Sequence, residues 1–218
     1  MEKYETMHEA ARNGDIAEVK RHVEEGADVD AEDVGGNTAL MWATREGHLD
    51  VVEYLVAHGA DVNAGYISGW TPLMIAASHD NLDAAKFLVE KGAEVNLSND
   101  FGHTPMLMAV DSGGLAVARF LAENGADVDA VDLEGMTILM RALPLGNIET
   151  VRFLVENGAD VNARDYDGYT VLNYSNYWRH LDILRILAEN GANIDGTDIL
   201  KNMADFLISG WRKVNKQR

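Results

Sequence analysis

Histidine and cysteine are the residue types from which a metal site would most readily be recognised in this 218-residue chain. The chain has no cysteine, which excludes thiolate metal sites, disulfides and cysteine nucleophiles. Its histidines lack the His-x-x-x-His and Cys/His spacings that zinc sites use. We interpret them as surface residues and predict no metal site. They are His8, His22, His48, His58, His79, His103 and His180.

Sequence motifs for catalysis are missing as well. There is no Gly-x-Ser-x-Gly nucleophile elbow and no glycine loop of the kind that holds phosphate. Aspartate and glutamate total 36 residues, so some carboxylates must lie near one another, but the sequence shows no pocket that would present such a pair to a substrate. We predict that the protein is not an enzyme and that it binds no cofactor.

Glycine and threonine recur every 33 residues, and such fixed self-similarity predicts a stack of structural repeats. The glycines are Gly26, Gly59, Gly92, Gly125, Gly158 and Gly191, and the threonines are Thr38, Thr71, Thr104, Thr137 and Thr170. Together they delimit repeats at about 5–37, 38–70, 71–103, 104–136, 137–169 and 170–202, followed by a C-terminal capping helix and basic tail at 203–218. We predict a single continuous repeat domain over residues 1–218.

Each repeat contains the signals for two helices and a turning loop. The hydroxyl of Thr71 can cap a first helix, and Pro72 then occupies the first helical position, where it loses no hydrogen bond. A second helix is predicted at 49–59, where apolar residues recur with helical spacing and Gly59 provides a left-handed end. The segment 61–70 is expected to return as a β-hairpin-like loop. Pro144 should end the first helix of the fifth repeat early.

Two series of apolar residues share the 33-residue period and should form the core between repeats. One consists of Leu55, Leu88, Leu121, Leu154 and Leu187, and the other of Val62, Val95, Val128, Val161 and Ile194. Burial of one such side chain contributes about 1.5–3 kcal/mol. We therefore expect both series to be buried and to hold each repeat against its neighbours.

The repeated text closely resembles the ankyrin repeat, which has this period and a Thr-Pro-Leu-His-x-Ala pattern. The matching segments are TPL at 71–73, TP at 104–105, GHLDVVEYLVAHGADVNA at 47–64 and FLVENGADVNARDYDG at 153–168. The resemblance implies an all-α repeat solenoid in which helix–turn–helix units are joined by β-hairpin loops. It also implies a concave face, lined by first helices and hairpin tips, that binds a partner protein.

Family positions that contact partners can be carried over to this sequence one residue at a time. They lie on exposed first-helix positions, at hairpin tips and just before each repeating threonine. Aromatic residues, Met and Arg are enriched there, as in protein interfaces, although some of them can instead pack hairpin against hairpin. The candidates are Trp42, Tyr66, Trp70, Ile75, Phe101, His103, Met108, Met136, Arg141, Tyr166, Tyr169 and Tyr174.

The charge is strongly acidic and unevenly distributed. Of the net −18, residues 1–202 contribute −21, from 14 basic and 35 acidic residues, and residues 203–218 contribute +3. A field of this sign repels phosphate backbones, which argues against nucleic-acid binding. The charge serves either solubility or the attraction of a basic partner. An alternative to the adaptor role is therefore an acidic inhibitor or sequestering protein that occupies a basic groove of its target.

The ends of the sequence show no targeting or membrane signal. The N-terminal residues 1–15 contain no apolar core of a signal peptide, and no run approaches the roughly 20 apolar residues needed to span a bilayer. We expect a cytoplasmic, monomeric protein with no membrane contact.

Overall fold

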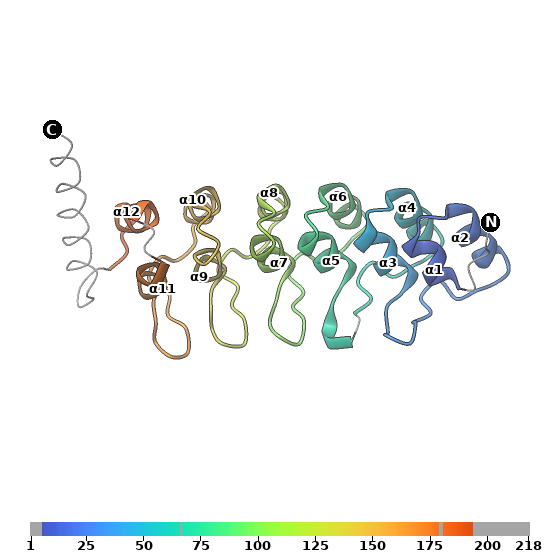
Figure 1. Ribbon diagram of the computed structural model, residues 1–218, viewed down its shortest axis with the longest axis horizontal. Helices are drawn as coiled ribbons and strands as arrows, with labels where there is room; N and C mark the ends of the chain where they lie inside the picture. Colours follow the sequence, from blue (N-terminus) through green and yellow to red (C-terminus); the bar gives the residue numbers. More distant parts are fainter. Residues whose placement is uncertain (1–5, 66, 179–180, 194–218) are drawn as a thin grey trace, which may run out of the picture. The chain divides into compact units, whose positions relative to one another are not determined.

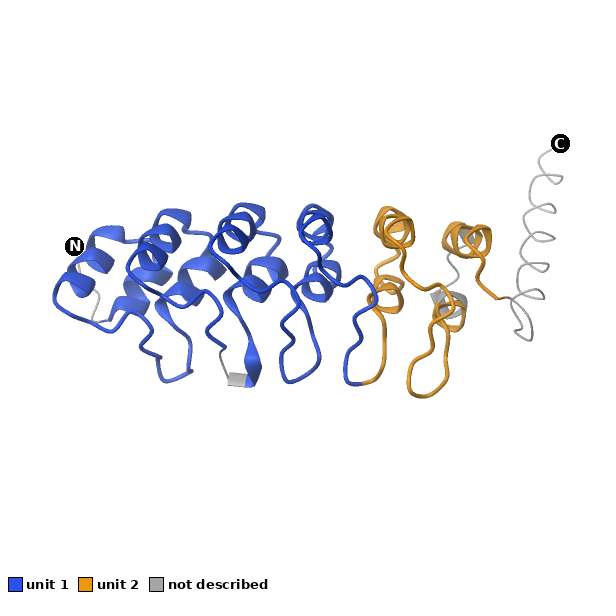
Figure 2. Cartoon of the chain, turned by 180° about the vertical axis from the view of Figure 1, so that it is seen from behind, with its two compact units in different colours: residues 1–133 blue, residues 134–218 orange. Residues whose placement is uncertain are grey.

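The computed structural model describes residues 6–65, 67–178 and 181–193. The chain divides into two compact units, residues 1–133 and residues 134–218 (Figure 2). Tyr66, Ile194 and the capping helix and tail predicted at 203–218 lie outside the described residues. Within the described part, no helix has the length and apolar content needed to cross a bilayer.

The first unit consists of helix pairs, each of which falls within one predicted repeat. The pairs are α1 (Met7–Arg12) and α2 (Ile16–Glu24), α3 (Ala39–Glu46) and α4 (Leu49–Ala57), α5 (Pro72–Ser78) and α6 (Leu82–Glu90), and α7 (Pro105–Asp111) and α8 (Leu115–Glu123), with the short 3-10 turn η1 (Ile67–Gly69) before α5. The first helices α1, α3, α5 and α7 pack side by side in one layer, and α2, α4, α6 and α8 form a second (Figure 1). The long loops extend away from the first-helix layer.

The second unit repeats this plan. Its helices are α9 (Ile138–Ala142), α10 (Ile148–Glu156), α11 (Val171–Trp178) and α12 (Leu181–Glu189). The first helices α9 and α11 contact each other, and so do the second helices α10 and α12. The predicted all-α, helix–turn–helix repeat fold is confirmed.

The repeating threonines start the first helices, as predicted. The hydroxyls of Thr38, Thr71 and Thr104 each accept a hydrogen bond of 3.3 Å from the backbone N–H three residues later. Thr137 does the same in the second unit. Each bond satisfies one of the N–H groups that the start of a helix leaves unpaired. These local caps explain why α3, α5, α7 and α9 begin where the threonine period places them. The hydroxyl of Thr170, before α11, instead donates to Oδ1 of Asn173 at 2.9 Å.

Pro144 shortens α9, also as predicted. This helix has five residues, whereas α5 has seven and α3 has eight. Its last helical residue is Ala142, with Leu143 as the cap immediately before the proline. The proline ring cannot be accommodated inside a helix, because it lacks an N–H and collides with the preceding turn.

The predicted leucine core is confirmed, and the valine series is buried only in part. All five leucines of the series have 0% exposure. Val62 and Val161 are buried, but Val95 and Val128 are only half-buried. The leucines lie on the second helices, whereas the valines lie in the loops that follow these helices, where burial differs from one repeat to the next.

In three of these loops an asparagine joins one repeat to the next. The side-chain amide of Asn63 donates to the Gly92 carbonyl at 3.2 Å, and its Oδ1 accepts from the Glu94 N–H at 2.9 Å. Asn96 and Asn162 make the equivalent two bonds to the repeats that follow them. These paired bonds fix the register of successive loops.

The hairpin-like loops that contain Asp33, Asn99 and Asp165 are each held by that polar side chain. Oδ1 of Asp33 accepts from the N–H groups of Gly35 at 2.8 Å and Asn37 at 2.9 Å, and Asn99 and Asp165 do the same in their own hairpins. The Asp33 N–H also donates to the Asn37 carbonyl at 2.9 Å. The chain therefore turns back at each tip with its backbone groups paired.

Neighbouring hairpins are joined through their backbones. Asp100 N donates to Ser68 O at 2.9 Å, and Leu133 N donates to Phe101 O at 3.3 Å. The second unit contains an equivalent bond between its own two hairpins. Gly102 has φ +77°, and a Cβ built there would lie only 2.9 Å from a backbone atom of the next hairpin. Glycine permits both the left-handed conformation and the close approach.

Candidate functional site

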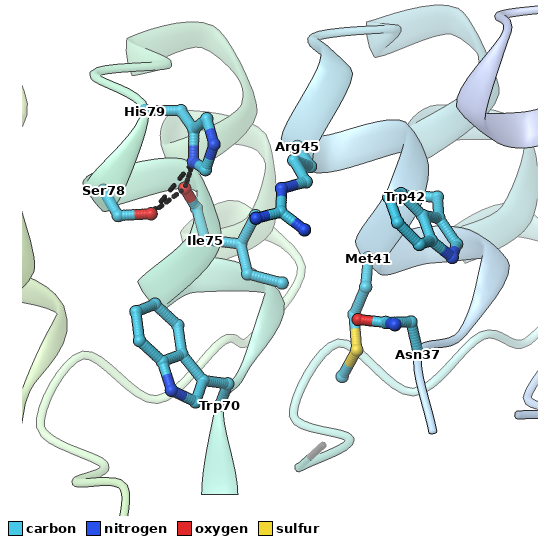
Figure 3. A pocket seen from close by; sticks show the side chains of 8 residues that line it. All are labelled: Asn37, Met41, Trp42, Arg45, Trp70, Ile75, Ser78 and His79. Atoms are coloured by element: carbon cyan, nitrogen blue, oxygen red, sulfur yellow. Dashed lines mark hydrogen bonds between the residues drawn. The ribbon is translucent and has the colours of Figure 1, made fainter. Parts of the chain in front are cut away.

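A surface pocket of about 190 Å³ lies between α3 and α5. Met41 and Ile75 form its buried floor, with 1% and 8% exposure, and Trp42 and Trp70 are half-buried. Figure 3 shows the two indoles on opposite sides, with the side chain of Arg45 reaching between them toward Ile75. The pocket is completed by Asn37, Ser78 and His79.

Trp42 is fixed in place by three neighbours. Its indole N–H donates to Oδ2 of Asp33 at 2.8 Å. The guanidinium groups of Arg12 and Arg45 lie 4.8 and 5.6 Å from its ring centroid, within the range of cation–π attraction. The hairpin before α3 therefore positions the indole, and two arginines from successive first helices surround it.

Asp33 has both oxygens occupied, because Oδ1 holds the hairpin and Oδ2 holds Trp42. Partial burial by itself would raise the pKa of this carboxyl group. The hydrogen bonds from Trp42, Asn37 and Gly35 outweigh that effect and lower the pKa below its ordinary value. Asp33 is therefore a structural acceptor that keeps its negative charge.

The second unit contains the same arrangement with different side chains. The hydroxyl of Tyr174 on α11 donates to Oδ2 of Asp165 at 2.5 Å, across the same nine-residue separation as Trp42 and Asp33. Burial, the bond to Asp165 and nearby carboxylates raise the pKa of Tyr174 well above its ordinary value. Tyr169 packs edge-on against Tyr174, with ring centroids 6.3 Å apart.

Comparison with models of protein families identifies these repeats. Four overlapping segments, residues 7–99, 65–132, 93–165 and 127–198, match the family model described as Ankyrin repeats (3 copies). The chain belongs to the ankyrin-repeat family. Ankyrin repeats generally mediate protein–protein interactions and are non-catalytic interaction modules. A comparison with curated proteins found no match.

The predicted partner-binding residues of this ankyrin-repeat protein fall into distinct environments. Trp42, Trp70 and Ile75 line the pocket together. The most exposed candidates are Tyr166, Phe101 and Tyr169, at 76, 51 and 48%. His103, Met136, Arg141 and Tyr174 are half-buried, Met108 is buried at 6%, and Tyr66 lies outside the described residues.

Three residues important for the pocket were not among the sequence candidates: Asp33, Arg45 and His79. Asp33 could have been found from the repeat register, because an aspartate lies nine residues before the indole Trp42 and again before the phenol Tyr174. At the equivalent pair of positions, Asn99 lies nine residues before Met108, and the Met108 side chain has no N–H or O–H with which to make such a bond. Arg45 and His79 carry no comparable signal, because a single polar residue on or beside a helix has the same sequence pattern as any solvated residue.

The polar side chains around the pocket are arranged as follows. Among the described residues, no three His, Asp or Glu side chains come together as a metal site would require. His79 Nδ1 lies 3.0 Å from the Ile75 carbonyl and 2.9 Å from the Ser78 hydroxyl, so its ring is oriented by its own helix (Figure 3). The pocket combines an apolar floor, two indoles and a guanidinium.

Proposed function

We propose that this protein binds a partner protein through the pocket between α3 and α5, with Trp42 and Trp70 as the main anchoring residues. The observation that carries the proposal is that two tryptophans, one on α3 and one just before α5, line one pocket above a buried apolar floor. Tryptophan and arginine are the residues most enriched among those that dominate binding energy in protein interfaces.

The pocket is suited to binding because it is already ordered. Trp42 is held by Asp33 and lies close to Arg12 and Arg45, so little side-chain freedom remains to be lost when a partner arrives. Ordering a mobile side chain on binding costs about 0.5–1.5 kcal/mol, which a fixed indole largely avoids. The exposed Phe101 of the same unit and the exposed tyrosines of the second unit are proposed as additional contacts.

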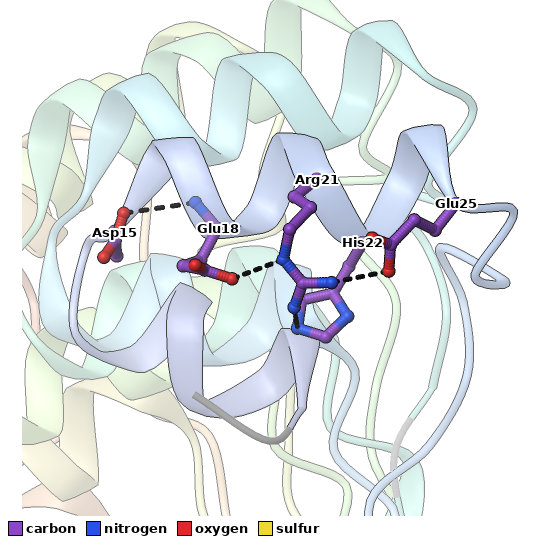
Figure 4. Close-up of polar contacts among 5 residues, drawn as sticks. All are labelled: Asp15, Glu18, Arg21, His22 and Glu25. Carbon is purple, nitrogen blue, oxygen red and sulfur yellow. Dashed lines mark hydrogen bonds and ion pairs between the residues drawn. The ribbon is translucent and has the colours of Figure 1, made fainter. Parts of the chain in front are cut away.

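A second candidate is an acidic inhibitor or sequestering protein that attracts a basic target through the first repeat. Residues 5–37 contain 10 acidic and 3 basic residues, which favours such a role. Part of this charge is neutralised within α2, because Arg21 bonds to Glu18 at 2.7 Å and to Glu25 at 2.5 Å (Figure 4). Association with a basic target would slow steeply as salt increases, because screening weakens attraction between exposed charges.

The test is affinity capture from a lysate, followed by calorimetry with the partner identified by mass spectrometry. Trp70→Ala is the preferred variant, because the structure gives the Trp70 indole N–H no hydrogen bond within the described residues. We expect binding to weaken by about 1–4 kcal/mol. The matched control is Phe87→Ala, which removes a half-buried aromatic side chain from the second-helix layer.

Circular dichroism and urea melts establish that both variants fold. A partner that binds wild type, Trp70→Ala and a Trp42→Phe/Trp70→Ala double variant with equal affinity would place the binding site elsewhere. Loss of binding in Phe87→Ala to the same extent would indicate general destabilisation and would also count against the pocket.

A further inference from the structure

The pocket lacks acidic residues in a chain that is rich in them. The chain has 36 acidic and 18 basic residues, yet none of the described residues that line this pocket is an aspartate or glutamate. A neighbouring hollow of about 450 Å³, which Trp42 also lines, contains Glu9, Glu32 and Asp33. The acid-free lining is therefore a local feature of the surface between α3 and α5.

Arg45 is the cation of the pocket, and the described part of the chain places no carboxylate within 4.0 Å of it. Arg12 and Arg21, in the same unit, both have such partners: Arg12 lies 3.9 Å from Glu46, and Arg21 lies between two glutamates. Arg45 instead extends over the pocket, with its guanidinium 5.6 Å from the Trp42 ring centroid. Its fork of N–H donors faces the space that an occupant would fill.

One further polar group of the pocket, the Trp70 indole, adds to this preference for an acceptor. The indole N–H of Trp70 makes no hydrogen bond within the described residues, so it is a second donor for an occupant. Asp33, the carboxylate that is bonded to Trp42, has both oxygens occupied by hydrogen bonds and is not part of the lining. The pocket therefore offers donors and a positive charge above an apolar floor.

We infer that the occupant is a segment of the partner protein in which an aspartate or glutamate lies beside a large apolar side chain. This inference rests on the proposed function. The apolar side chain packs between the two indoles onto Met41 and Ile75, and the carboxylate accepts hydrogen bonds from the Arg45 guanidinium. Guanidinium and carboxylate match as planar, two-point partners, and partial removal of water strengthens such bonds.

Long-range electrostatics then oppose the local attraction. The net charge of −18 repels an acidic segment until it reaches the pocket. Screening by salt weakens this repulsion more than the short contact inside the pocket. We therefore expect association to become faster as salt rises toward physiological strength, which is opposite to the behaviour of a basic target.

The experiment is selection of binders from a phage-displayed library of random heptapeptides. Wild type, Arg45→Gln and Trp70→Ala are used as targets, with Arg152→Gln as the matched control. Arg152 is an exposed arginine of α10, so that change alters the net charge equally without touching the pocket. Peptides selected by wild type should carry Asp or Glu within two positions of Leu, Phe, Tyr or Trp, and Trp70→Ala should lose them.

A synthetic selected peptide and its Asp→Asn or Glu→Gln form are then compared by calorimetry. Wild type and Arg152→Gln should prefer the acidic form by about tenfold or more, since hydrogen bonds between charged groups have this strength. Arg45→Gln should reduce the preference below about twofold. Stopped-flow rates on wild type should increase with salt.

The outcomes separate the inference from the function on which it rests. Peptides that require Trp70 but show no acidic preference, or prefer Lys or Arg, would overturn the inference and leave the pocket as the binding site. An acidic preference that persists unchanged in Arg45→Gln would also overturn it. A selection without any peptide that depends on Trp70 would count against both proposals.

Discussion

The hydrogen bond between Asp33 and Trp42 makes a sharp prediction about the substitution Asp33→Asn. Asparagine keeps the Oδ1 acceptor that holds the hairpin, and Asn99 shows that the chain tolerates it at this position of the repeat. The second oxygen of Asp33 would be replaced by an NH₂ group that faces the indole N–H of Trp42. Two donors would then oppose each other where a charged acceptor now accepts a bond of 2.8 Å.

The magnitude follows from the type of bond that is lost. A hydrogen bond to a charged group contributes about 1.5–3 kcal/mol. Asp33 and Trp42 are both half-buried, so we take the lower part of that range and expect a loss of about 1.5–2 kcal/mol in the free energy of unfolding. Asn99 already has an amide at the equivalent position, and its Nδ2 is buried without a hydrogen-bond partner.

The assay is a double-mutant cycle measured by urea denaturation at pH 7. Wild type, Asp33→Asn, Trp42→Phe and the double variant are compared, and the indole N–H resonance of Trp42 is followed by NMR. In the Trp42→Phe background, which lacks the indole N–H, Asp33→Asn should change the free energy of unfolding only slightly. If Asp33→Asn is as costly in the Trp42→Phe background as in wild type, the effect comes from the hairpin and the reasoning is wrong.

The pH dependence gives an independent check on the same bond. The pKa of Asp33 is lowered in the folded protein from an ordinary value of 3.8. Its stabilising contribution is therefore present above that value and is lost as pH falls through the lower folded pKa. The difference in stability between wild type and Asp33→Asn should stay constant from pH 7 to about pH 5 and disappear in stronger acid.

Three further predictions concern the core, a hairpin and the second unit. Leu121→Ala should lower the free energy of unfolding in urea melts by about 2–5 kcal/mol because this side chain is fully buried, and Val128→Ala should lower it clearly less because Val128 is half-buried. Equal losses in the two variants would contradict this packing. Gly102→Ala should destabilise more than Gly59→Ala, since both have positive φ but only the former would place a Cβ against backbone, and thermal melts of equal midpoint would refute this. The pKa of Tyr174 is raised in the folded protein, so the stabilisation from its hydrogen bond is complete below the unfolded pKa near 10 and declines as pH rises above it. An absorbance titration should show one tyrosine that ionises at higher pH than the others, and Tyr174→Phe should lack it.

Much of the fold could be predicted because its signals are local and repeated. A threonine cap depends on the three residues that follow it, and the leucine series depends on helical spacing within one segment. Both could therefore be predicted from the sequence alone. The prediction that Val95 and Val128 are buried was wrong, because a loop position that recurs in every repeat need not be covered on every side. Burial of a loop depends on the neighbouring repeat, which the period does not describe.

The pocket was predicted only in part. Trp42, Trp70 and Ile75 were identified through positions carried over from the family, and the structure places all three around one cavity. Met108 occupies an equivalent first-helix position but is buried, because its long apolar side chain packs inward where an indole or phenol reaches toward its hairpin aspartate. Arg45 could not be predicted, because its role follows from the lack of a carboxylate within 4.0 Å of it among the described residues, and this is a property of the folded surface.

The backbone bonds between hairpins restrict how the length of this protein can change. Each bond joins residues that are 32 positions apart, and the donors Asp100, Leu133 and Tyr166 follow one another at intervals of 33. Duplication or deletion of a whole repeat would recreate every one of these bonds with new neighbours. Gain or loss of a single residue between the two partners of such a bond would change their separation from 32 and disrupt that bond. The gene can therefore grow or shrink in steps of 33 codons, and each such step would add or remove one row of side chains from the surface that a partner meets.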